Sequence, residues 1–257
     1  MSGSVEPRPR PLTVLVTGGS GASGVAVARA LQGAGHKVYT VGSDRMRIEA
    51  AARRAADGVT PLACDLARLD DVVRLRDTVI SSAGAVDAVI HLVGGWRGAT
   101  GIPDQSDEDW NFLEQGAITT LRNVTRVFFD DIAASPMGRF AMVSSTSVEK
   151  PAAAVASYVA AKAAAEAWTM AVADGFRRTA GTGGGDAAAV VLAVKALVDD
   201  EARRQYPERT FPGATDVADL AAAVVALFDA PAADLNGTRI RLAAQPAAAA
   251  AAQPYID

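Results

Sequence analysis

The sequence predicts an α/β fold in which helices cover both faces of a doubly wound parallel sheet. Short β-branched runs alternate with segments of helical periodicity. The first run leads through the glycine-rich turn VTGGSGASG into a helix, and no linker-like stretch divides the 257 residues, which are 50% apolar. Parallel strands need crossover connections, which the helices supply. We therefore expect a single domain with a sheet of about seven strands.

Seven segments are expected to form the strands, because each is short, rich in β-branched or other apolar residues and bounded by turn-forming residues. They are residues 12–18, 36–42, 59–64, 86–95, 138–145, 187–197 and 235–242. The expected helices cover residues 24–35, 47–57, 69–83, 107–132, 152–174 and 215–229. Ligands of such sheets bind beyond the carboxyl ends of the strands, so the residues that follow each strand are candidates for a functional site.

The two ends of the chain differ in composition from the domain between them. Residues 1–11, MSGSVEPRPRP, have no hydrophobic core for export and are expected to form a disordered arm. Residues 244–257 are rich in alanine and are expected to form a low-complexity tail, either loose or lying on a partner subunit. The domain is therefore expected to span residues 12–243.

Charge, hydropathy and cysteine content argue against several classes of function. The net charge of −4, with both signs interspersed, gives no basis for binding nucleic acid or an anionic membrane. No apolar run approaches the roughly 20 residues that span a bilayer. The single cysteine, Cys64, allows no internal disulfide, which fits a cytoplasmic location. With only His36 and His91 beside that cysteine, no metal site is expected.

The turn VTGGSGASG is expected to bind a dinucleotide, as in a Rossmann-type domain. It can be read as G-x-G-x-x-G, with Gly19, Gly21 and Gly24, or as T-G-x-x-G-x-x-G, starting at Thr17 and Gly18. Missing β-carbons let the backbone approach a pyrophosphate, and the helix N-terminus supplies unpaired N–H groups. The alternative is a tight turn that needs positive φ. The expected cofactor contacts are Gly18, Ser20, Gly21, Ala22, Ser23 and Gly24.

The residues after the second and third strands bear on which dinucleotide binds. Asp44 has the spacing of an acid that holds the ribose hydroxyls of NAD. Ser43, with Arg45 or Arg47, could instead bind the 2′-phosphate of NADP, and the sequence slightly favours NADP. Asp65 follows the third strand, where it could accept a hydrogen bond from the adenine amino group or cap the next helix.

Tyr158 and Lys162 lie four residues apart in the alanine-rich helix, so their side chains share one face. A free phenol titrates near pH 10, and a nearby ammonium together with an oxidised nicotinamide would lower that pKa toward neutrality. Ser145 ends the fifth strand and could stabilise charge on a carbonyl oxygen. The alternative for the pair is an amphipathic helix with a snorkelling lysine.

The motifs TGGSGASG, CDL, HLVGG, VSSTS and YVAAK, in this order, resemble those of the short-chain dehydrogenase/reductase family. The resemblance extends from about Leu12 to Leu242. It implies an NAD(P)-dependent oxidoreductase that transfers a hydride between nicotinamide and a ketone or secondary alcohol. In that role Tyr158 is the general acid/base, Lys162 binds the nicotinamide ribose and lowers the tyrosine pKa, and Ser145 orients the substrate carbonyl.

The resemblance also implies the remaining contacts. Further cofactor contacts are expected at Asp65, Leu66, Leu92, Val93, Gly94 and Leu197. The helices at 107–132 and 152–174 are expected to lie side by side and to pair two subunits, which gives a homodimer or homotetramer.

Three departures from the family pattern leave alternatives open. His91-Leu92-Val93-Gly94 replaces Asn-Asn-Ala-Gly, Ala117 stands where many members have an asparagine, and the Pro-Gly usual after the sixth strand is missing. Gln115 or a water could replace that asparagine. The chain could therefore be a catalytically weak dinucleotide-binding regulator or scaffold; an epimerase is disfavoured by length. His91 is expected to be a hydrogen-bonded core histidine.

Two further features concern the expected substrate cleft. Trp96 could wall the substrate cleft or pack structurally. Residues 201–213 could form a substrate lid in which Arg203, Arg204 and Arg209 attract an anionic substrate, but a solvated loop is the preferred interpretation.

Overall fold

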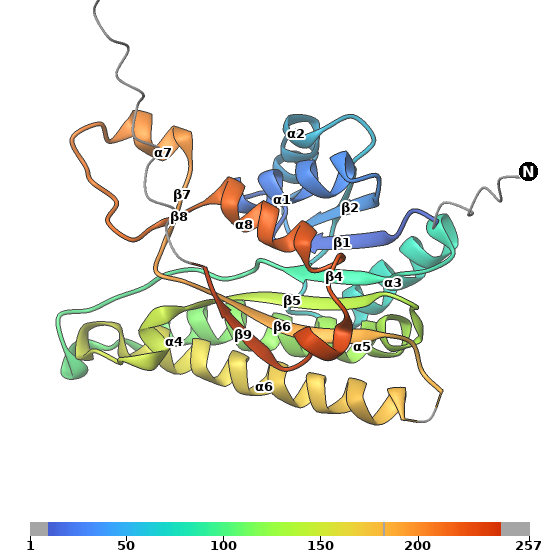
Figure 1. Cartoon of the computed structure of the whole chain (residues 1–257). Coiled ribbons are helices and arrows are strands. Elements are labelled where there is room, and N and C mark those ends of the chain that lie inside the picture. Colours follow the sequence, from blue (N-terminus) through green and yellow to red (C-terminus); the bar gives the residue numbers. More distant parts are fainter. Residues whose placement is uncertain (1–9, 182, 243–257) are drawn as a thin grey trace, which may run out of the picture.

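The computed structural model describes residues 10–181 and 183–242. The expected tail at 244–257 and residues 1–9 of the expected arm lie outside this part. The described residues form a seven-stranded sheet with the order β3-β2-β1-β4-β5-β6-β9, whose bounds follow, and a two-stranded ladder of β7 Leu197–Val198 and β8 Thr215–Asp216 (Figure 1). Every strand pair in both sheets is parallel, which confirms the predicted fold class.

The strands of the main sheet agree with the expected segments, mostly with shorter bounds. They are β1 Thr13–Thr17, β2 Lys37–Gly42, β3 Thr60–Ala63, β4 Ala88–His91, β5 Gly138–Ser145, β6 Ala187–Val194 and β9 Thr238–Arg241. Because all are parallel, their carboxyl ends meet at one edge. The register places Thr17 beside His91, and Ser145 beside Val194.

Helices cover both faces of the sheet (Figure 1). One face carries α1 Ala22–Gly33, α2 Arg45–Ala55 and α8 Val217–Ala226, and the other carries α3 Leu69–Ala83, α5 Thr120–Ala134 and α6 Ala156–Ala180. Valine, leucine and alanine side chains make up most of the first core layer, whereas the second contains more phenylalanines. The short α9, Ala232–Leu235, leads into β9.

The expected helix at 107–132 is present but interrupted. It consists of α4 Asp107–Glu114, a π-helical turn η2 at Gln115–Thr119, and α5. Thr120 Oγ1 donates to the Gly116 carbonyl at 2.7 Å within this turn. Such π-helical turns frequently occur at functional sites.

The expected strand at 86–95 is wrong in its second half, because β4 ends at His91 and residues 92–98 have no regular structure. Gly95 faces the Phe112 ring so closely that a Cβ atom would lie 2.4 Å from it. Arg97 then stacks over Phe112 at 4.0 Å and pairs with Asp109 at 3.2 Å. The segment after β4 is therefore fastened to α4 instead of continuing the sheet.

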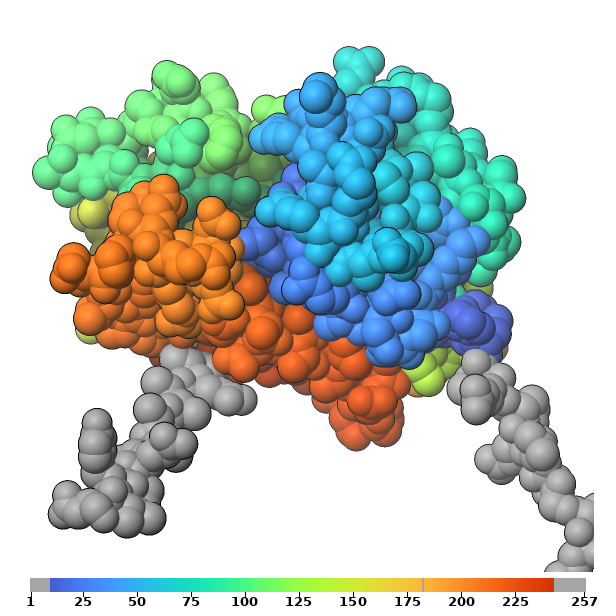
Figure 2. Space-filling model, turned by 90° about the horizontal axis from the view of Figure 1, so that it is seen from above, coloured from blue at the N-terminus to red at the C-terminus, as the bar shows by residue number. Residues whose placement is uncertain are grey.

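The segment after β6 also differs from expectation. The strand ends at Val194 instead of residue 197, and Leu197–Val198 form β7, paired with β8 at Thr215–Asp216. The preferred solvated loop at 201–213 begins with the last five residues of a short helix, α7 Asp200–Gln205, which the Asp199 side chain caps by accepting from Ala202 N at 2.8 Å. In the space-filling view this orange region borders the green surface of residues near 100–115 (Figure 2).

Candidate active site

The glycine-rich turn lies at the carboxyl end of β1 and shows why glycine is needed there. Gly18 has φ +76°, and a Cβ atom on it would lie 2.8 Å from the Leu92 carbonyl carbon. A Cβ on Gly24 would lie 2.5 Å from Gly19 Cα, so this glycine lets α1 pack on the turn. Gly21 faces open space instead, because a Cβ atom on it would lie 3.8 Å from the Gly18 carbonyl oxygen, an ordinary van der Waals distance.

The N-terminus of α1 is suited to an anion. Among the described residues, no side chain accepts a hydrogen bond at its N-cap, Gly21, and its first turn contains no acidic residue. By contrast, Asp44 caps α2 by accepting from Arg47 N at 2.8 Å. The open space at Gly21 and the uncapped N–H groups of α1 fit the diphosphate of a dinucleotide.

Two adjoining cavities lie along the carboxyl edge of the sheet. The first, of about 480 Å³, is called the turn cavity here because the glycine turn lines it. Its lining includes Gly18, Ser20, Gly21, Ser43, Arg47, Asp65, Leu66, Leu92, Val93, Gly94, Phe112, Gln115, Gly116 and Thr120. These residues come from the ends of β1 to β4 and from the interrupted helix, so the cavity can accommodate the adenosine side of a dinucleotide.

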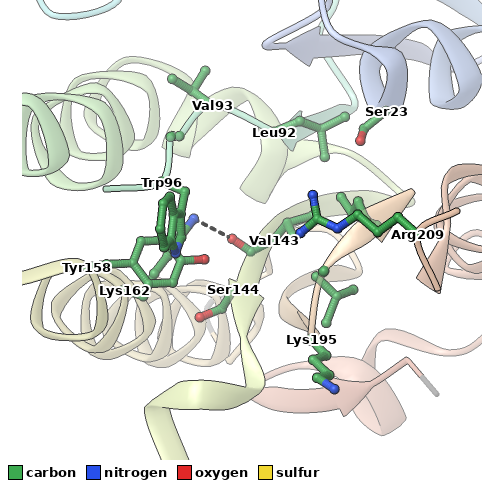
Figure 3. A pocket seen from close by; sticks show the side chains of 15 residues that line it. Ser23, Leu92, Val93, Trp96, Val143, Ser144, Tyr158, Lys162, Lys195 and Arg209 are labelled. Carbon is green, nitrogen blue, oxygen red and sulfur yellow. Dashed lines mark hydrogen bonds between the residues drawn. The ribbon is translucent and has the colours of Figure 1, made fainter. Parts of the chain in front are cut away.

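The second cavity, of about 530 Å³, is called the reaction cavity here (Figure 3). It is lined by Ser23, Leu92, Val93, Gly94, Gly95, Trp96, Val143, Ser144, Tyr158, Lys162, Val194, Lys195, Ala196, Leu197 and Arg209. The two cavities share Leu92, Val93 and Gly94. One extended ligand could therefore occupy both.

Lys162 is buried, with 7% of its surface exposed, and its Nζ donates to the Val143 carbonyl at 2.9 Å (Figure 3). A Cβ atom on Gly94 would lie 3.2 Å from that Nζ, so the glycine leaves space beside the ammonium. Tyr158, one turn earlier on α6, lines the same cavity. Both side chains therefore face the same cavity instead of lying on the outer surface of the helix.

Ser145 is buried at the end of β5 and interacts with Tyr158 through a side-chain hydrogen bond. Its Oγ also accepts from Ser147 N at 3.1 Å and so caps the 3-10 turn η3, Thr146–Glu149. The neighbouring Ser144 donates to Glu166 Oε1 and lines the reaction cavity. The capping role belongs to Ser145 itself.

Comparison with known proteins shows the family to which the chain belongs. The protein-family model described as short chain dehydrogenase matches residues 12–180. The chain belongs to the short-chain dehydrogenase family.

A curated relative within this family is the acetoacetyl-CoA reductase of Allochromatium vinosum. It is 29% identical over 167 residues, which cover 62% of this chain and 66% of the relative. The aligned region thus spans slightly less than two thirds of the relative's length.

Solved structures confirm the dehydrogenase fold. A short-chain type dehydrogenase/reductase from Mycobacterium ulcerans has a TM-score of 0.76 at 21% identity, covering 90% of this chain and 88% of the other. The 3-ketoacyl-(acyl-carrier-protein) reductase from Brucella melitensis, complexed with NADH, has a TM-score of 0.77 at 20% identity, with coverages of 90% and 96%.

Burial has the largest effect on the pKa values of Tyr158 and Lys162. It raises the pKa of Tyr158, and the hydrogen bond with Ser145 lowers it only in part. Burial also lowers the pKa of Lys162 to about 8, against the opposing charge of Glu166. Lys162 is not among the causes of the Tyr158 shift. The expected lowering of the Tyr158 pKa also needs an oxidised nicotinamide, so it stays a prediction for the cofactor-bound protein.

The Ala117 position shows what replaces the family asparagine. Ala117 is buried in a small apolar cluster with Leu113 and Ala161, against which Tyr158 packs. Gln115, weighed as its substitute, lines the turn cavity instead of the reaction cavity. Gln115 therefore faces a different cavity from the one that Tyr158 and Lys162 line.

His91 is a hydrogen-bonded core histidine, as expected. It is 2% exposed, with Nδ1 2.8 Å from Thr17 Oγ1 and Nε2 3.3 Å from Thr120 Oγ1. Burial and the charge of Lys162 lower its pKa to about 3. It is therefore neutral at physiological pH and joins β1, β4 and α5.

Most of the expected site residues of the dehydrogenase line one of the two cavities, whereas Ala22, Gly24, Asp44 and Ser145 line neither. Asp65 also accepts from Ala67 N at 3.0 Å, within the turn before α3. Gly116 and Thr120 were missed, although a glycine inside an expected helix was an available signal. Among the described residues, no helix is long and apolar enough to cross a bilayer.

Proposed function

We propose that the protein is an NAD(P)-dependent oxidoreductase that interconverts a ketone and a secondary alcohol. The observation that carries the proposal is the shared reaction cavity of Tyr158 and Lys162, which continues past Gly94 into the turn cavity. The glycine turn and the uncapped α1 supply a place for the diphosphate. The named relatives, which are reductases, are consistent with this chemistry.

The nicotinamide, when bound, supplies or accepts the hydride. Tyr158 donates a proton to the carbonyl oxygen in reduction and removes it in oxidation. Ser145 hydrogen-bonds Tyr158 and would hold the same substrate oxygen as its charge develops. Lys162 carries its ammonium beside Gly94, where it would bind the nicotinamide ribose and favour the phenolate.

Turnover by the purified protein tests this proposal. NADPH or NADH is mixed with a panel of ketones, and loss of the nicotinamide absorbance is followed. We expect turnover that falls at least about 10³-fold in Tyr158→Phe, which removes the exchangeable proton and little else. Tyr206→Phe is the matched control, because Tyr206 is exposed and lines neither cavity. Equal loss in both variants would contradict the assignment.

We propose that the cofactor is NADP rather than NAD. Ser43 and Arg47 line the turn cavity, whereas the Asp44 carboxylate caps α2 and also lies 3.7 Å from Arg47 Nε. A guanidinium there suits a 2′-phosphate better than free ribose hydroxyls. Arg47→Gln should weaken NADPH binding about tenfold and NADH binding little, measured by calorimetry. Arg45→Gln is the control. Equal effects on both cofactors would contradict the preference.

A second candidate is a dinucleotide-binding regulator with weak turnover. The apolar packing of Ala117 favours it, because the residue provides no polar side chain behind Tyr158. Tight cofactor binding without turnover across a broad carbonyl panel would support this alternative.

We also propose a cytoplasmic homodimer or homotetramer paired through α5 and α6. These helices run side by side, and Trp168 Nε1 donates to Thr125 Oγ1 at 2.9 Å between them. A groove of about 430 Å³ there includes Phe129, Trp168 and Val172. Light scattering tests the pairing, and a monodisperse monomer would overturn it.

A further inference from the structure

The charge of the reaction cavity is unbalanced. Lys162, Lys195 and Arg209 line it, and none of its described lining residues is acidic. Lys162 is accounted for by its role beside the nicotinamide ribose. The two remaining cations come from the segment that follows β6, on the side of the cavity facing Tyr158 and Trp96 (Figure 3).

Arg209 differs from the other two arginines of its segment. Arg203 pairs with Asp216 at 3.0 Å, and Arg204 lies 3.9 Å from Glu201. Among the described residues, Arg209 has no carboxylate partner within ion-pair distance, and its guanidinium lies 5.6 Å from the centre of the Phe211 ring. Figure 3 shows its side chain extending toward Val143, into the cavity.

Lys195 plays a lesser part. Its Nζ donates to the Pro212 carbonyl at 2.7 Å, and in Figure 3 it points away from Arg209. This hydrogen bond ties the end of β6 to the segment that carries Arg209. The lysine therefore supports the segment and adds positive potential, whereas the guanidinium is the group free to bind.

The position of Arg209 separates it from the diphosphate site. The glycines of the first turn, Gly18 and Gly21, line the turn cavity, and Arg209 does not. Only Ser23 of α1 reaches the cavity that Arg209 lines. An anion bound by Arg209 is thus placed with the reacting groups, not with the glycine turn.

We propose that Arg209 binds an acidic group of the substrate, so that the protein acts on a ketone or alcohol that also carries a carboxylate or phosphate-like anion. This inference rests on the proposed function and deepens it. A guanidinium offers two parallel N–H donors to such a group, which a lysine cannot match. Trp96, 63% exposed at the same cavity, would cover the carbon chain between the carbonyl and the anion.

Equilibrium binding to protein loaded with NADP⁺, which has no hydride to transfer to a ketone, tests the inference independently of turnover. The probes are acetoacetate, 4-oxopentanoate and 5-oxohexanoate, each compared with its neutral methyl ester, and acetonylphosphonate, compared with its neutral dimethyl ester. We expect at least one acid to bind about tenfold tighter than its ester. Arg209→Met should abolish that preference without changing ester binding, and Arg209→Lys should retain part of it. Arg204→Met, which removes an arginine of the same segment outside the cavity, should keep it.

Three results would overturn the inference. Acids that bind no tighter than their esters would show that the cavity does not select anions. An unchanged acid preference in Arg209→Met would assign the selection elsewhere. Weakened NADP⁺ binding in Arg209→Met with an unchanged acid-to-ester ratio would assign the guanidinium to the dinucleotide. If acids bind through Arg209 but no ketone turns over, the proposed function fails and the anion site remains.

Discussion

Glu166 on α6 and Arg239 on β9 form an ion pair with Oε2 and Nε 2.9 Å apart, and the pair holds both serines that end β5. Ser144 Oγ donates to the other oxygen of Glu166, and Arg239 Nη2 donates to the Ser145 carbonyl at 3.0 Å. Arg239 also pairs with Glu149. Strand, helix and edge strand are thus joined directly behind the reaction cavity.

Arg239→Met should therefore disturb both stability and the site. It removes the charged partner of the half-buried Glu166, which keeps only the Ser144 hydroxyl, and the side-chain donor to the Ser145 carbonyl, which we expect to cost about 2 kcal/mol in the free energy of unfolding. We also expect kcat to fall more than KM rises, because Ser145 loses its backbone anchor. Arg241→Met is the control, since Arg241 is exposed and its ion pair with Glu149 is long, at 3.8 Å. Urea unfolding and steady-state kinetics measure both effects, and normal kcat in Arg239→Met would contradict the anchoring role.

His91 should make the fold acid-sensitive. Its pKa is about 3 in the native state and about 6.5 when unfolded, so below pH 6.5 the unfolded state binds a proton that the native state does not. Stability is therefore unaffected above pH 6.5 and lost as the pH falls toward 3, by about 2 kcal/mol at pH 5.

Urea unfolding of wild type and His91→Gln at pH 7.5, 6 and 5 measures this difference. The variant should be less stable at pH 7.5 and should show a smaller decline on acidification. The partly buried His36, whose pKa burial also lowers, provides the comparison variant His36→Gln. Parallel pH profiles of wild type and His91→Gln would contradict the prediction.

Lys162 affects stability with the same sign as His91, but in a window at higher pH. Its pKa falls from 10.5 to about 8 on folding, so between these values the unfolded state binds more protons. The cost of burying the ammonium is fully present below pH 8 and disappears as the pH rises to 10.5, a total of about 3 kcal/mol. Lys162→Met should abolish turnover yet be no less stable than wild type at pH 7. A strongly destabilised Lys162→Met would show that the bond to Val143 outweighs desolvation.

Arg139 is a stability residue far from the site. It is 1% exposed, and its guanidinium donates to the carbonyls of Leu227, Asp186, Ala230 and its neighbour Gly138. Arg139→Met should reduce the free energy of unfolding by about 4 kcal/mol, because several buried carbonyls lose their donor. Arg29→Met, at an exposed arginine that also donates to two carbonyls, should cost about 1 kcal/mol. Urea unfolding compares them, and similar losses would contradict the role of burial.

The local part of the site could be predicted from the sequence. Tyr158 and Lys162 share a face because helical spacing is fixed within one turn, and the glycine turn occurs where a strand meets a helix. The parallel sheet followed from the alternation of elements. These inferences need no knowledge of distant contacts.

What the sequence could not reveal depends on contacts between distant segments. Glu166 and Arg239 are 73 residues apart, and neither lies in a motif. In the sequence Arg209 is equivalent to Arg203 and Arg204, and only the structure shows that those two have carboxylate partners. The short helix α7 was missed because its six residues, five of them polar, carry no periodic signal. The raised pKa of Tyr158 depends on burial, which spacing does not report.

The hydrogen bond from Arg239 to the Ser145 carbonyl joins residues that are 94 apart in the sequence, and this separation affects when the site can form during synthesis. A ribosome releases Ser145 well before Arg239, so the nascent chain can assemble its first strands while the serine loop still lacks its anchor. Catalytic competence is then expected to arrive late, after the edge strand has left the exit tunnel and docked.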